Sequence, residues 1–118
     1  MKLLTQEIMD KLVANGTRQA PVKGTPQEID FQPVVKLFTP DAGCTWLLTE
    51  IDPDNPDIAF GLCDLGFGFP ELGYVSLTEI GELRGLAGLP VERDRFFKAN
   101  KTLSQYADEA RKAEQIVA

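Results

Sequence analysis

The sequence predicts an α+β fold with a mainly antiparallel, four- to five-stranded meander sheet, an N-terminal helix, a C-terminal helix and a short helix after the fourth strand. Runs of β-branched and aromatic residues follow one another between residues 31 and 77, separated by turns rich in Pro, Gly and Asp. Amphipathic segments with capping signals lie on both sides of this region. The 118 residues contain no internal repeat, so we expect one domain over residues 1–118.

The first helix is expected to begin after Thr5, which can cap it, with Leu4 and Met9 at the positions of a hydrophobic staple. Its apolar face runs to the stop signal Asn15-Gly16. Residues 16–30 lack periodicity and hold two prolines and two glycines. We therefore expect a flexible loop or tether there, inside the domain.

Four strands are expected at residues 31–38, 44–51, 57–65 and 71–77. A symmetric turn between the second and third strands would place three pairs of residues opposite one another: Cys44 with Cys63, Trp46 with Gly61, and Leu48 with Ala59. An aromatic ring facing a glycine is a favourable pair, since the ring covers the exposed backbone.

After the strands, Ser76 and Glu79 form a capping box that opens a short helix, which ends near Gly85 or Gly88. Residues 89–98 are expected to add an edge strand. A second capping box, Thr102 with Gln105, opens the closing helix. Its apolar face is expected to hold Leu103, Tyr106, Ala110, Ala113 and Val117.

The glycine-rich stretch at residues 61–74 resembles a phosphate-binding loop only superficially. Glu71 stands where a dinucleotide fingerprint needs its third glycine, and a strand rather than a helix follows. The sequence therefore predicts a tight corner, with positive φ at Gly66 and Gly68 and a bulge or close contact at Gly73.

The chain contains no histidine, which excludes Ser-His-Asp, Cys-His and histidine-base mechanisms. It also lacks a Cys-x-x-C motif, so the usual structural zinc sites are excluded. Cys44 and Cys63 could form a cross-strand disulfide or a redox pair, but two reduced core thiols are the favoured interpretation. We expect no cofactor and no bound metal.

Acidic residues concentrate in the middle of the chain, where residues 25–83 carry eleven acidic side chains against one basic. This charge argues against direct binding of nucleic acid and favours a protein partner. The candidate binding residues are the acidic hairpin, Glu50, Asp52, Asp54 and Asp57, and two aromatic residues of the corner, Phe67 and Phe69. The hairpin could also bind Mg²⁺ or Ca²⁺, or mimic the phosphates of DNA, although its prolines interrupt the row of charges.

The function expected from these features is that of a non-catalytic accessory or interaction protein. The alternative is a carboxylate-based enzyme of unknown substrate, with or without a metal ion, in which Asp64 and Glu71 are the catalytic residues because they flank a rigid turn. That alternative predicts a concave pocket between the corner and the acidic turn. The other aromatic residues, including Trp46, Phe60 and Tyr74, are expected in the core.

The run from Pro33 to Leu77, and GLPVERD at residues 88–94, resemble a family of small bacterial proteins catalogued as a domain of unknown function. The resemblance covers nearly the whole chain. It implies a setting on plasmids and integrative or conjugative elements, and it brings no catalytic residues. The amphipathic first residues and the absence of an eighteen-residue apolar run lead us to expect a cytoplasmic protein that does not span a membrane.

Overall fold

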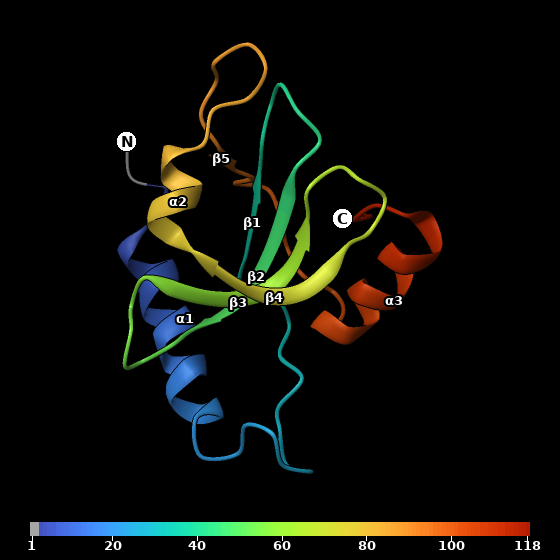
Figure 1. Ribbon diagram of the computed structural model, residues 1–118. Coiled ribbons are helices and arrows are strands. Elements are labelled where there is room, and N and C mark those ends of the chain that lie inside the picture. The colour runs from blue at the N-terminus through green and yellow to red at the C-terminus, as the bar shows by residue number, and fades with distance from the viewer. Residues whose placement is uncertain (1–2) are drawn as a thin grey trace.

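The computed structural model describes residues 3–118 and has the predicted α+β fold (Figure 1). The helices are α1 (Gln6–Gln19), α2 (Leu77–Glu82) and α3 (Leu103–Ala113). The strands are β1 (Val35–Phe38), β2 (Thr45–Ile51), β3 (Ile58–Asp64), β4 (Glu71–Ser76) and β5 (Glu92–Arg93). All neighbours pair antiparallel in the order β4-β3-β2-β1-β5, so β1 to β4 form the predicted meander and β5 returns to the free side of β1.

The start of α1 follows the prediction. The Thr5 hydroxyl accepts a hydrogen bond from the Ile8 N–H at 3.2 Å, which satisfies one of the first unpaired amides of the helix. Leu4 and Met9 both pack into the core beneath the sheet, as a hydrophobic staple requires.

The end of α1 differs from the prediction, because the helix passes through Asn15-Gly16 and continues to Gln19. A Cβ atom at Gly16 would lie closer than 3.0 Å to the carbonyl oxygen of Ile51 in β2. Glycine is needed at this position because the backbone of α1 touches the backbone of β2, and not because the helix ends. The segment that follows, residues 20–31, is called the strap below.

The predicted register between β2 and β3 is wrong. Trp46 lies opposite Cys63, Leu48 opposite Gly61 and Ile51 opposite Ala59, in place of the pairs Cys44–Cys63, Trp46–Gly61 and Leu48–Ala59. The hairpin closes between Asp52 and Ile58, so the turn is centred on Asn55, and a bulge between Leu48 and Glu50 shifts the register again.

The glycines of β3 and β4 also differ from expectation. Gly73 lies opposite Gly61 in an unbroken register, and a Cβ atom there would meet nothing within 4 Å, so the predicted bulge or close contact is wrong. The close approach is at Gly61, where a Cβ atom would collide with the carbonyl oxygen of Leu47. Gly66 and Gly68 have φ of 85° and 84°, which confirms the prediction for the corner.

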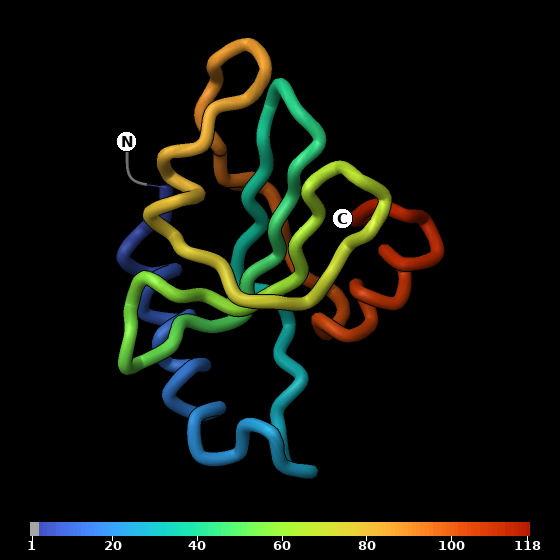
Figure 2. The backbone as a smooth tube through the Cα atoms, in the orientation of Figure 1, coloured from blue at the N-terminus to red at the C-terminus, as the bar shows by residue number. Residues whose placement is uncertain are grey.

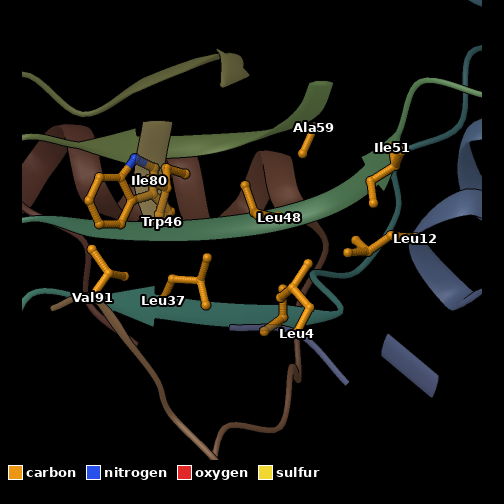
Figure 3. Packing of buried hydrophobic residues seen from close by; sticks show 10 residues of the cluster. Leu4, Leu12, Leu37, Trp46, Leu48, Ile51, Ala59, Ile80 and Val91 are labelled. Atoms are coloured by element: carbon orange, nitrogen blue, oxygen red, sulfur yellow. The ribbon is translucent and has the colours of Figure 1, made fainter. Parts of the chain in front are cut away.

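The two faces of the sheet are covered by different helices, with α1 and α2 on one side and α3 on the other (Figure 1). On the α1 face, Trp46, Leu48 and Ile51 belong to one cluster of buried residues, in which Ile51 lies beside Leu12 and Trp46 lies beside Ile80 at the other end (Figure 3). On the α3 face, buried β2 and β3 side chains meet the apolar face of α3, in the cluster Leu47, Leu62, Leu103, Tyr106, Ala107 and Ala110. This alternation of faces along one strand is the period of two that a buried sheet requires.

The later elements form where predicted but are shorter. The Ser76 hydroxyl accepts from the Glu79 N–H at 3.2 Å, and α2 ends at Glu82, before Gly85. The edge strand β5 has only two residues.

The capping box of Thr102 and Gln105 is confirmed at the start of α3. The helix ends at Ala113 because Glu114 takes a left-handed conformation with φ of 59°. Ala113 and Val117 are therefore exposed, and their expected places on the buried face are wrong. Between residues 3 and 118 no helix is both long and apolar enough to pass through a membrane.

Candidate functional site

The two candidate catalytic carboxylates do not meet. Glu71 lies opposite Cys63 and is exposed on the α1 face, whereas Asp64, the next residue of β3, points to the α3 face. Asp64 is only 4% exposed and accepts hydrogen bonds from the N–H groups of Gly66 and Ile116, each at 2.9 Å. Its observed contacts fix the corner and the C-terminal tail to the end of β3.

The turn between β2 and β3 and the corner between β3 and β4 lie at opposite ends of the sheet (Figure 2). None of five well-formed cavities within residues 3–118 is lined by both segments. The separation of the turn from the corner argues against the concave pocket that an enzyme built on these two carboxylates requires.

The acidic hairpin does not present a row of free carboxylates. Asp57 accepts hydrogen bonds from the Ser76 hydroxyl at 2.6 Å and from the Thr78 hydroxyl and N–H at 2.6 and 2.9 Å. These bonds lower the pKa of Asp57, with Ser76 as the largest cause. They tie the β2–β3 turn to the start of α2.

The other residues of the hairpin divide between two places. Asp52 accepts the Asp54 N–H at 2.8 Å, an ordinary turn contact, and Asp54 is exposed beside it. Glu50 lies outside the turn, on the α3 face of β2, opposite Phe60. These residues were predicted to act together because they are close in the sequence, but the bulge and the turn place them on different parts of the surface.

The aromatic residues of the corner are exposed. Phe67 and Phe69 are each 78% exposed, as the candidate contact role requires. Tyr74 in β4 is 51% exposed, so its predicted place in the core is wrong, whereas Trp46 is 2% exposed as expected. With Leu65 and Leu72, the exposed residues of this region form one apolar stretch that follows the chain from the corner into β4.

The outer edge of β4 carries free backbone groups. The Leu77 N–H donates to the Asp57 carbonyl at 2.8 Å, and in an antiparallel pair every second residue bonds to the same neighbour. Val75 and Gly73 therefore bond to β3, while the N–H and C=O groups of Leu72 and Tyr74 point away from the sheet. Within residues 3–118 no other group bonds to them, because β4 is the edge strand. We call this edge, with the side chains of Leu72 and Tyr74, the β4 edge.

A cleft of about 340 Å³ lies on the α3 face between the strap, the sheet and the start of α3. Glu50, half-buried, lies in its floor with Thr49 and Phe60. Burial raises the pKa of Glu50, and hydrogen bonds from Thr49 and Gln19 oppose that effect. The sequence could not reveal this cleft, because its walls come from segments up to 85 positions apart, Gln19 and Ser104.

Cys44 and Cys63 are both free thiols, partly buried beside the α1-face core. Burial, and then the charge of Glu71, raise the pKa of Cys63 to about 11. Among residues 3–118 no three His, Cys, Asp or Glu side chains come together as a metal site would require.

Comparison with known proteins identifies the family of the chain. Residues 3–117 match the model of a family described as "Protein of unknown function (DUF2958)", and the chain therefore belongs to that family. No curated protein and no solved structure matches the chain.

Proposed function

We propose that this member of the family is a non-catalytic interaction protein that binds an extended segment of a protein partner along the β4 edge. The observation that carries the proposal is the edge strand itself, whose outward N–H and C=O groups at Leu72 and Tyr74 are unpaired in the described chain. An added strand would satisfy these groups, as in other cases of strand addition to a sheet. The mobile-element setting implied by the family resemblance belongs to the same proposal, with the partner encoded by such an element or by its host.

The side chains of the β4 edge indicate the composition of the segment. Leu72 and Tyr74 point to the α3 face and offer apolar contact, with Phe60 and Tyr74 packed at 5.0 Å between ring centroids. Glu71 is exposed on the other face, and Glu79 and Glu82 are exposed on α2, which directly follows β4. A segment with apolar residues toward the α3 face and Lys or Arg toward the α1 face complements both.

The acidic hairpin gives less support to a binding role than the β4 edge does. Three of its four carboxylates accept hydrogen bonds from neighbouring backbone or hydroxyl groups, and one of these three, Glu50, lies in the cleft. A DNA-mimic action needs a string of free charges to enter a basic groove. The β4 edge is thus the surface on which the proposal rests.

The test uses a synthetic seven-residue peptide of alternating Lys and Val, with an alternating Glu and Val peptide as its charge control. Amide hydrogen exchange is measured by NMR on the whole protein with and without peptide. We expect the Lys-Val peptide to slow exchange at Leu72 and Tyr74, while Gly73 and Val75 are protected with or without it. If neither peptide protects Leu72 and Tyr74, the proposal is wrong.

A pair of substitutions isolates the backbone contribution. Tyr74→Pro removes the outward N–H, and Tyr74→Ser keeps it; both remove the ring, and neither removes a bond to β3. We expect Tyr74→Pro to bind the Lys-Val peptide at least tenfold more weakly than Tyr74→Ser. Equal affinities would show that the peptide does not add as a strand.

A further inference from the structure

The cleft on the α3 face contains a carboxylate that the fold does not use. One oxygen of Glu50 accepts from the Thr49 hydroxyl at 3.3 Å, and Glu50 makes no salt bridge with any basic residue of the described chain. The Lys23 ammonium favours the charged form of Glu50 but makes no salt bridge with it, and lies 4.2 Å from the centroid of the Tyr74 ring. A half-buried carboxylate without a directly paired counter-ion is stabilised by a cationic ligand that contacts it.

The other two carboxylates of the cleft are engaged locally. Asp30 accepts from the N–H and hydroxyl of Ser104, and Glu28 accepts from the Gly24 N–H at 3.3 Å. No Lys or Arg side chain lines the cleft. Glu28 and Glu50 are therefore the lining carboxylates that can accept a further hydrogen bond, and of these two Glu50 is half-buried whereas Glu28 is exposed.

The walls of the cleft are apolar and fixed in place. Phe31, Phe60 and Leu72 are among its lining residues. The Gln19 side chain bonds both the N–H and the C=O of Ile29, at 2.8 and 2.7 Å, and so holds the strap to the end of α1. Across the cleft, the N–H of Leu103 at the start of α3 donates to the Phe31 carbonyl at 2.8 Å. A pocket with fixed walls binds without first having to order them.

We propose that this cleft binds a primary alkylammonium group, with the ammonium on Glu50 and the alkyl stem against the apolar wall. The volume lies at the low end of the range for ligand pockets, about 300–1,000 Å³, and so fits a short chain. The Thr49 hydroxyl lies 3.3 Å from one oxygen of Glu50, so an ammonium, which needs a single oxygen, fits this carboxylate more simply than a guanidinium, which would share both. The site shares Leu72 with the β4 edge but does not need an added strand.

Two sources could supply the same group: a free amine, or a lysine side chain of a protein. Titrations with n-butylamine and with Nα-acetyl-lysine N-methylamide at pH 7, followed by NMR shifts of the Thr49, Glu50 and Phe60 amides, distinguish them. Tighter binding of the lysine derivative assigns the site to a partner's lysine, and tighter binding of butylamine to a free amine. Both results support an ammonium site.

The shape of the site is tested by a series of ligands. From ethylamine to butylamine each added methylene should tighten binding about fourfold, which corresponds to ~0.8 kcal/mol per buried CH₂. n-Butanol, which has the same shape as butylamine without the charge, should bind at least tenfold more weakly than butylamine. Butylguanidine should bind no more tightly than butylamine. Equal binding of the alcohol and the amine would overturn the proposal.

The role of the carboxylate is tested by Glu50→Gln, with Glu7→Gln as the control for net charge because Glu7 is exposed on α1. We expect Glu50→Gln to weaken butylamine binding at least tenfold and leave butanol binding unchanged, and Glu7→Gln to change either by less than twofold. Circular dichroism and the unperturbed amides verify that both variants are folded. An unchanged affinity in Glu50→Gln contradicts the assignment even if peptide binding at the β4 edge is confirmed.

Discussion

Replacing Gly16 by alanine tests whether α1 crosses β2 at backbone contact. In an exposed helix, alanine is preferred over glycine by about 1 kcal/mol, so sequence rules alone predict a stabilised protein. In this fold the new Cβ would collide with the Ile51 carbonyl, and the helix would have to move by more than 1 Å to restore a separation of 3.0 Å. Because Leu12 on the same helix is completely buried, that movement disrupts the α1-face core.

The expected cost is that of overpacking a core, about 1–3 kcal/mol of unfolding free energy. Gly81 offers a matched control, because it lies in α2 with nothing within 4 Å of a new Cβ atom, and there alanine should stabilise by about 0.5–1 kcal/mol. The same substitution is thus expected to have opposite signs at two helical glycines.

The assay is urea unfolding followed by the fluorescence of Trp46, the one tryptophan of the chain, which is 2% exposed. With a urea slope of about 1.5 kcal/mol/M, the midpoint of Gly16→Ala should fall by roughly 0.7–2 M and that of Gly81→Ala should rise by about 0.3–0.7 M. A Gly16→Ala protein as stable as the wild type would show that α1 does not lie against β2 as described.

Three further expectations concern residues that hold the fold. Asp64→Ala removes the acceptor of two charge-assisted hydrogen bonds, so the free energy of unfolding should fall by about 2–4 kcal/mol. Hydrogen exchange at the Ile116 amide should become faster, and an unchanged exchange rate would contradict the contact between Asp64 and the C-terminal tail. The lowered pKa of Asp57 means that its carboxylate stabilises the fold above about pH 4, and that this advantage over Asp57→Asn is lost as pH falls through the lowered value. Thermal melts should therefore show a larger difference between the two proteins at pH 6 than at pH 2, and an equal difference would contradict the contacts of Asp57. The Cys63 thiol, with a pKa of about 11, should react with a disulfide reagent at pH 8 about a hundredfold more slowly in the folded protein than in the unfolded chain. The two rates are measured by peptide mass spectrometry, and equal rates would contradict the burial of Cys63.

The elements of the fold were predictable because their signals are local. A helix cap such as Thr5, or the capping box of Thr102 and Gln105, is recognised from four consecutive residues, and it determines where a helix begins. The register between β2 and β3 was not predictable, because the composition of the strand does not indicate the bulge near Thr49. The end of α1 was predicted wrongly for a related reason. Glycine is needed at position 16 because of the Ile51 carbonyl, 35 positions away in the sequence, and not because of its neighbours in the helix.

The candidate site was predictable only in part. The exposure of Phe67 and Phe69 was predictable because both lie at a glycine-rich tip, and their role in binding stays a prediction. Glu50 was also named, but as a member of the acidic hairpin, since its place in the cleft depends on the strap and α3. The free backbone groups of Leu72 and Tyr74 have no sequence signal, because which strand forms the edge of a sheet is a property of the topology.

The fate of the acidic residues shows why net charge is a poor guide to function in this chain. Asp57 ties a turn to a helix, Asp64 holds the C-terminal tail, and Asp41 accepts from the Ala87 and Leu89 N–H groups and so fastens the β1–β2 turn to the loop after α2. Each of these carboxylates satisfies main-chain amides that short turns cannot pair among themselves. A protein with many tight turns therefore becomes acidic for structural reasons, and a substitution of such a residue that abolishes binding would report unfolding rather than contact. Glu50 is different, because no main-chain amide of the described residues donates a hydrogen bond to it, so Glu50→Gln is expected to disturb the fold less than the loss of Asp41, Asp57 or Asp64.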